Sequence, residues 1–269
     1  MPDFAALLPI ALAGLASIAA LALGAWAASL VRRDASLVDR VWSLMIAGPA
    51  LVYAAHTAWS SPRALAVLAL VLAWGLRLAA YITWRSWGHG EDRRYRQIRE
   101  RHQPHFGLRS LYLVFALQTG LAWIVSAPTL AALAGGRAFG ALDVAGIAAA
   151  LAGFLFEAIG DAQMAAFKAD ASNAGQVMDR GLWRYTRHPN YFGEALFWWG
   201  LWLVALGAGG AAAIWTVLSP LLMTLLLLKV SGVAMLERDI GERRPAYRDY
   251  IARTNAFVPG PPRRGETST

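Results

Sequence analysis

The stretch FAALLPIALAGLASIAALALGAWAASL, residues 4–30, decides the class of fold, because its 27 residues include no charged side chain. A bilayer core about 30 Å thick is crossed by roughly 20 apolar residues in an α-helix. The run starts almost at Met1, lacks a basic leader region and exceeds the length of a signal peptide. We therefore expect a retained membrane helix.

Six further apolar runs of comparable length follow, and 57% of all residues are hydrophobic. The mean hydropathy of +0.42 is too high for an ordinary soluble domain. We predict an all-α, polytopic membrane bundle of seven transmembrane helices that forms a single membrane domain over residues 1–259. The predicted spans are 4–30, 41–59, 64–84, 111–133, 142–163, 191–206 and 213–236. The remaining residues, 260–269, are rich in Pro, Gly and Arg and are expected to be a disordered tail.

The basic residues fall on one side of this predicted bundle. Segments 29–40, 84–109, 166–190 and 237–269 contain 21 of the 25 Lys and Arg residues. Since Lys and Arg are retained on the cytoplasmic side during insertion, the N-terminus is predicted outside and the C-terminus in the cytoplasm, in the cell inner membrane. This topology also explains the net charge of +8 without nucleic acid as a partner. Cysteine is absent, which excludes disulfides and thiolate chemistry.

The densest group of functional side chains is GLWRYTRHPNYFGE, residues 181–194, where a basic loop enters the sixth predicted span. Its arginines and histidine suit phosphate or carboxylate, its asparagine suits an amide, and its tyrosines can stack or donate. Gly193 permits close approach of another backbone or of a flat ligand. Glu194 would lie one turn inside the membrane, where an ionisable group is costly enough to suggest function. The alternative is that the cations are interfacial anchors and that Glu194 pairs with one of them. The candidate residues in this run are Arg184, Tyr185, Arg187, His188, Asn190, Tyr191 and Glu194.

Two further acids, Glu157 and Asp161, lie one turn apart at the inner end of the fifth predicted span. Like charges at this spacing repel unless they meet cations, hydroxyls or a ligand. Because no histidine stands at a ligand-like spacing beside them, we expect no metal site and favour hydrogen bonding to a ribose or an amide.

Near the inner ends of the second and third predicted spans lie Asp39, Trp42 and Tyr81. An Asp–Tyr pair at the membrane boundary can polarise a substrate carbonyl. The alternative for Asp39 is an ion pair with an arginine that tethers two helices. The loop 88–95 and the tail complete the inner face, and Tyr247 and Tyr250 follow helical spacing, so that the tail helix either caps a cofactor cleft or simply exposes its charges.

Taken together, these motifs resemble the membrane steroid 5α-reductase family, in its bacterial branch. The resemblance is strongest over residues 154–259, where 181–194 and the ending YIARTNAFVP, 250–259, match the C-terminal half of the family. Residues 39–42 and 88–95 match the N-terminal half less specifically. The resemblance implies a seven-helix enzyme that binds NADPH and reduces the 4,5 double bond of a 3-oxo-4-ene steroid or a similar lipid enone, an oxidoreductase acting on CH–CH bonds.

The resemblance also implies roles for particular residues. Catalysis would involve Asp39, Tyr81 and Glu194, and the substrate would contact Asp39, Trp42 and Tyr81. Animal members use a Gln–Glu pair and a Tyr where this chain offers Asp39 and Tyr81. The implied cofactor-binding residues are Glu157, Asp161, Lys168, Arg184, Tyr185, Arg187, His188, Asn190, Tyr191, Glu194, Glu237, Arg238, Tyr247, Tyr250 and Arg253. The expected partners are the lipid-like enone and membrane lipid, and the expected state is a monomer.

One alternative function uses the same motif. Residues 187–193 also resemble the cofactor stretch of isoprenylcysteine and phospholipid methyltransferases, which use S-adenosylmethionine. Methyl transfer needs no carbonyl-polarising acid, so Asp39 and Tyr81 would then be structural. A lipid-binding or transport protein is a further alternative, and it predicts a polar pathway that reaches both faces of the membrane.

Overall fold

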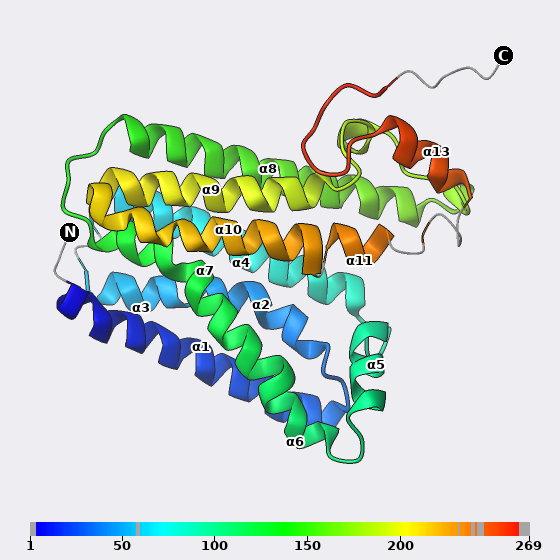
Figure 1. The fold of residues 1–269 in the computed structure, drawn as a ribbon, viewed down its shortest axis with the longest axis horizontal. Coiled ribbons are helices and arrows are strands. Elements are labelled where there is room, and N and C mark those ends of the chain that lie inside the picture. The colour runs from blue at the N-terminus through cyan, green and yellow to red at the C-terminus, as the bar shows by residue number, and fades with distance from the viewer. Residues whose placement is uncertain (1–3, 58–59, 231, 238–239, 241–244, 264–269) are drawn as a thin grey trace. The chain divides into compact units, whose positions relative to one another are not determined.

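The computed structural model describes residues 4–57, 60–230, 232–237, 240 and 245–263, and in this part of the chain all regular elements are helices (Figure 1). The first half contains α1 (Phe4–Arg32), α2 (Leu37–Ala47), α3 (Pro49–Ala55), α4 (Pro62–Ser86), α5 (Arg93–Arg101), α6 (Phe106–Ser110), η1 (Leu111–Ala116) and α7 (Leu117–Ala134). The second half contains α8 (Ala141–Ala169), η2 (Ala171–Asn173), η3 (Gly181–Arg184), α9 (Pro189–Gly209), η4 (Gly210–Val217), α10 (Leu218–Leu225), η5 (Leu226–Val230), α11 (Val233–Glu237) and α13 (Ala246–Arg253).

Six helical runs in the described residues are long and apolar enough to cross a membrane, which confirms the all-α, multi-pass class. They are Ala5–Arg32, Leu37–Ala55, Pro62–Ser86, Phe106–Ala134, Ala141–Ala169 and Pro189–Glu237. The last run has 49 residues and contains both of the last two predicted spans. It reverses direction, since the Trp199 indole donates a hydrogen bond to the Thr224 hydroxyl at 3.2 Å. Gly210 lies at the reversal with a φ of +63°, a conformation that favours glycine.

The chain divides into two compact units. The N-terminal unit comprises residues 1–144 and 201–219, and the C-terminal unit comprises residues 145–200 and 220–269. Each unit is described separately below. Of the predicted tail, the described residues Gly260 and Arg263 donate backbone hydrogen bonds to Tyr185 and Arg253, and residues 264–269 lie outside the described part.

In the N-terminal unit, α1, α2, α3, α4 and α7 pack against one another. Small residues bring α2 and α4 close together, and the Ser43 hydroxyl donates to the Gly75 carbonyl at 2.8 Å. At the start of α4, the Arg63 guanidinium forms a two-pronged ion pair with Asp143, with N–O distances of 2.6 and 2.9 Å. Both side chains are buried, at 6% and 1% exposure, so this pair fixes the start of α4 against the start of α8.

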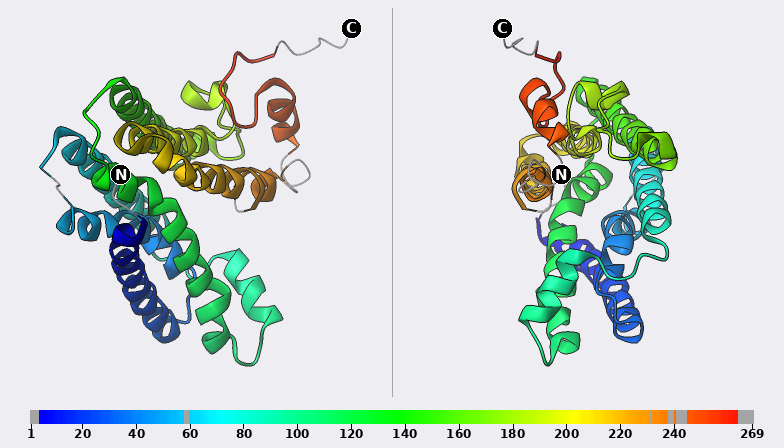
Figure 2. Two further views of the ribbon diagram at one scale, coloured as in Figure 1. Left: turned by 60° about the vertical axis from the view of Figure 1, so that its left-hand side comes forward. Right: turned by 90° about the vertical axis from the view of Figure 1, so that its right-hand side faces the viewer.

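In the C-terminal unit, α8 and α9 lie side by side with their backbones in contact (Figure 2). A Cβ atom on Gly153, Gly193 or Gly200 would lie 2.4 Å from a backbone nitrogen of the facing helix. We call Gly153, Gly193 and Gly200 the glycine ladder. Small residues allow this close approach of helices in membranes, where apolar side chains gain little by leaving lipid.

Candidate functional site

The segment that leads into α9 is anchored to the C-terminal part of the chain. Pro189 occupies the first position of α9, where its missing N–H is harmless. The Thr186 hydroxyl donates to the Phe257 carbonyl at 2.8 Å, and the Arg187 N–H donates to the Asn255 carbonyl at 2.9 Å. The start of α9 is therefore held in place by the residues after α13.

Arg187, His188 and Glu237 form a tightly connected cluster in this unit. The Arg187 guanidinium donates two hydrogen bonds to the Glu237 carboxylate, of 2.7 and 2.8 Å, and His188 Nε2 lies 2.9 Å from the same carboxylate. The remaining arginine nitrogen donates to the carbonyls of Ile251, at 3.1 Å, and Thr254. Burial alone would favour the neutral guanidine, but the hydrogen bonds and charge of Glu237 outweigh it and raise the pKa of Arg187.

Because this guanidinium is engaged by one carboxylate and two carbonyls, Arg187 joins α9, α11 and the end of α13. The His188 ring is stacked on Tyr191, with centroids 5.3 Å apart. The segment at the end of α13 thus has a definite set of contacts with α11 and the start of α9.

Asn190 and Asp161, two of the candidate cofactor-binding residues, lie in contact. The Asn190 side-chain nitrogen donates to Asp161 at 3.2 Å. The Asn190 side-chain oxygen is buried and has no hydrogen-bond partner among the described residues. An unsatisfied buried acceptor costs free energy, so this oxygen marks a place where a ligand N–H would be stabilising.

Two more acids of the predicted site are also buried, Glu157 at 2% and Glu194 at 8% exposure, while Asp161 is at 4%. The glycine ladder brings their helices together, because a Cβ on Gly193 would lie 2.4 Å from the backbone nitrogen of Glu157. Of the two uses predicted for Gly193, the structure shows close approach of another backbone.

The remaining predicted residues of this unit lie at its surface or in α13. Arg184, Tyr185 and Lys168 are exposed, and Arg253 forms an exposed ion pair with Asp179 at 2.6 Å. The Tyr250 hydroxyl donates to the Trp183 carbonyl, and burial raises the pKa of Tyr250. The Tyr247 ring contacts the Tyr250 ring edge-on, and Arg238 lies outside the described residues.

In the N-terminal unit, Asp39 accepts hydrogen bonds from two residues of α5. The Tyr95 hydroxyl donates to one carboxylate oxygen at 2.6 Å, and Arg94 forms an ion pair with the other at 2.8 Å. Burial and the Asp39 charge raise the pKa of Tyr95, and the same charge raises the pKa of Arg94 against the effect of burial. The Gln118 amide in turn donates to the Tyr95 hydroxyl at 3.2 Å.

The hydrogen-bonding tyrosine of Asp39 is therefore Tyr95, and the alternative of an Asp39–Arg ion pair that tethers two helices is what the structure shows. Tyr81 instead lies among cations, with the guanidinium carbons of Arg77 and Arg85 at 5.9 and 5.5 Å from its ring centroid. Trp42 is half-buried on α2.

No pattern in the sequence points to Tyr95, Arg94 or Gln118 individually. The signal was present only as the loop 88–95, whose two acids and two arginines precede a tyrosine. Gln118 stands alone in an apolar helix, and nothing in the local sequence indicates its partner.

These features define a multi-pass helical membrane protein that carries a buried polar cluster in each of its two units. The chain belongs to the family described as "Protein of unknown function (DUF1295)", whose model matches residues 25–254. It is also similar to an uncharacterized protein of Schizosaccharomyces pombe, with 25% identity over 261 residues that cover 87% of this chain and 75% of the yeast protein. No solved structure matches this chain.

Proposed function

We propose that this protein is an NADPH-dependent membrane reductase that saturates the 4,5 double bond of a 3-oxo-4-ene steroid or a similar lipid enone. The observation that carries the proposal is the buried polar cluster of the C-terminal unit, in which Asp161 of α8 accepts a hydrogen bond from Asn190 of α9. Buried ionisable groups in apolar helices are costly and commonly serve function. The resemblance to membrane steroid 5α-reductases, strongest over residues 154–259, gives this cluster its proposed ligand.

The residues present fit a nicotinamide cofactor. The unpartnered oxygen of Asn190 is an acceptor for a carboxamide N–H, and its own N–H₂ group is oriented by Asp161. The exposed Arg184 and Lys168 supply cations for phosphate groups at the surface of the same unit. When bound, NADPH would supply the hydride that adds to the β carbon of the enone.

Arg187 and Glu237 take a positioning role in this proposal. Their two-pronged ion pair holds α9 and the tail helix together, so that Asn190 and Glu194 keep a fixed orientation on α9. Glu194 is the proposed partner of the nicotinamide end, as the resemblance implies.

The enone would bind in the N-terminal unit. Both oxygens of the Asp39 carboxylate already accept hydrogen bonds, from Tyr95 and Arg94, so we assign polarisation of the carbonyl to the Tyr81 hydroxyl. The guanidinium groups of Arg77 and Arg85 beside the Tyr81 ring would stabilise negative charge that develops on the substrate oxygen. Asp39 then holds α2 against α5 through its contacts with Arg94 and Tyr95.

The proposed topology has seven crossings, because the last apolar run reverses at Gly210. With the basic segments in the cytoplasm of a cell with an inner membrane, the N-terminus lies outside. NADPH would then reach the C-terminal unit from the cytoplasm.

Methyl transfer from S-adenosylmethionine is the second candidate function. One observation favours it. Asp39 is held in an ion pair with Arg94, and methyl transfer needs no carbonyl-polarising acid, so Asp39 would be structural in such an enzyme.

Thermal stability of the detergent-purified protein with NADPH, NADH and S-adenosylmethionine separates the two candidates. The reductase predicts stabilisation by NADPH and loss of NADPH absorbance with a 3-oxo-4-ene steroid. Glu194→Gln should abolish turnover while the fold is retained, and Tyr81→Phe should lower kcat more than it weakens cofactor binding. Stabilisation by S-adenosylmethionine alone, or unaltered turnover in Glu194→Gln, would contradict the reductase.

A further inference from the structure

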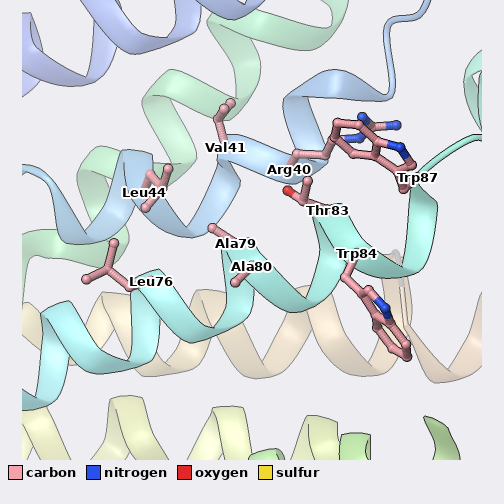
Figure 3. A pocket seen from close by; sticks show the side chains of 9 residues that line it. All are labelled: Arg40, Val41, Leu44, Leu76, Ala79, Ala80, Thr83, Trp84 and Trp87. Atoms are coloured by element: carbon pink, nitrogen blue, oxygen red, sulfur yellow. The ribbon is translucent and has the colours of Figure 1, made fainter.

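An open groove runs between α2 and α4 of the N-terminal unit (Figure 3). Its volume of about 830 Å³ falls in the range of roughly 300–1,000 Å³ that is typical of ligand sites. Its lining is mostly apolar and comprises Arg40, Val41, Leu44, Leu76, Ala79, Ala80, Thr83, Trp84 and Trp87. None of the residues assigned above to the enone, which are Asp39, Trp42 and Tyr81, lines it.

The groove has one polar end and one apolar end. Arg40 comes from the first turns of α2 and lies beside the end of α4, since it donates to the Ser86 carbonyl at 3.2 Å. Trp84 and Trp87 lie at this same end and are 64% and 70% exposed. Leu76 lies three turns deeper than Trp87 along the α4 sequence, roughly 16 Å at 1.5 Å per residue. Exposed tryptophans beside an arginine are typical of the membrane interface, with the apolar part reaching toward the bilayer core.

Arg40 is incompletely satisfied by the protein. Its Nε atom is buried and has no hydrogen-bond partner among the described residues. The Asp34 Oδ2 atom lies 4.0 Å from the guanidinium, at the outer limit of an ion pair, and Ser36 donates to the other oxygen of Asp34. A guanidinium with a free donor at the interface attracts an anion, most strongly a phosphate.

We infer that this groove binds an anionic glycerophospholipid, with its phosphate on Arg40 and one acyl chain along Leu44, Leu76 and Ala80. Three properties favour this occupant: the positive charge at the interface end, the tryptophans at headgroup depth and the apolar lining below them. A free phosphate would use only the first of the three. The binding does not depend on the reductase activity.

Native mass spectrometry of the detergent-purified full-length chain tests this inference, with dioleoyl phosphatidylglycerol and dioleoyl phosphatidylcholine as the probes. Both lipids carry a phosphate, but in phosphatidylcholine the choline cation offsets its charge beside Arg40, so we expect one site that prefers phosphatidylglycerol by about tenfold. Arg40→Gln should remove this preference, whereas Arg101→Gln, an equal loss of charge on the exposed end of α5, should retain it.

A second variant keeps the test valid if Arg40→Gln fails to fold. Ala80→Phe fills the groove and leaves Arg40 unchanged in the sequence, so it should weaken binding of both lipids. Inorganic phosphate should not compete with phosphatidylglycerol. Equal preference in Arg40→Gln and Arg101→Gln would overturn the inference. So would full competition by inorganic phosphate, or displacement of the lipid by progesterone, which would assign the groove to the enone.

Discussion

Replacing Arg187 by lysine tests how strongly the planar guanidinium group of Arg187 holds residues 246–255, which we call the C-terminal segment. The arginine makes two hydrogen bonds to Glu237, at 2.7 and 2.8 Å, and donates to the carbonyls of Ile251 and Thr254. A lysine ammonium keeps the charge but not this planar geometry, so that it can retain one bond to Glu237 and one to a carbonyl, and it loses the other two.

The expected cost follows from these losses. A hydrogen bond to a charged group contributes about 1.5–3 kcal/mol, and one to a neutral carbonyl about 1 kcal/mol. Loss of one of each therefore costs about 3 kcal/mol, or roughly a hundredfold in the opening equilibrium of the segment, at about 1.4 kcal/mol per tenfold. Glu237 and Arg187 are only 15% and 8% exposed, so solvent screening reduces this value little.

Hydrogen exchange measured by mass spectrometry reports this opening directly. Amides of residues 246–255 should exchange roughly a hundredfold faster in Arg187→Lys, while peptides from α1 should be unchanged. Arg184→Lys, at an exposed position three residues earlier, is the matched control. If amides of residues 246–255 exchange at the same rate in both variants, the Arg187 guanidinium does not hold this segment.

Three further predictions concern other parts of the fold. Gly193→Ala should lower the melting temperature and reduce the yield of folded protein, because its Cβ would lie 2.4 Å from the facing α8 backbone; a variant as stable as the wild type would show that the helices can separate without cost. Arg63→Met should lower the free energy of unfolding by about 3–5 kcal/mol, because it leaves Asp143 buried and unpaired, and the double replacement with Asp143→Leu should recover much of this loss in denaturation experiments. Burial opposes ionisation of Glu91, but the Arg99 hydrogen bonds outweigh it and lower the pKa of Glu91 below its usual 4.5. Its stabilisation is therefore present above pH 4.5 and is lost as the pH falls through the folded-state pKa, so Glu91→Gln should flatten the acid side of the stability profile, and an unchanged profile would refute this role.

The membrane class was predictable because it depends on local composition. Runs such as 4–30 have to be helical in a bilayer, where every backbone group needs an internal partner. Asn190 and Asp161 were both candidates at the inner ends of neighbouring predicted spans, but the hydrogen bond between them was not predicted. The number of membrane crossings is harder to read from the helices, because the reversal at Gly210 lies within one continuous helical run.

The partners of charged residues were not predictable in the same way. Asp39 can pair with any of several arginines and tyrosines on the basic side, and its choice of Arg94 and Tyr95 depends on how α5 packs, 55 residues later. Likewise, the attachment of Arg187 to Glu237 bridges 50 residues of sequence. Pattern analysis identifies which residues need partners, whereas the tertiary structure decides which partners they receive.

The glycine ladder sets how α8 and α9 can move. Gly153, Gly193 and Gly200 bring the two backbones so close that no layer of side chains lies between them to deform. Sliding one helix along the other would carry a residue with a Cβ into a space that only glycine fits. Sliding of one helix along the other is therefore energetically costly. A displacement of either helix moves both together as a rigid body.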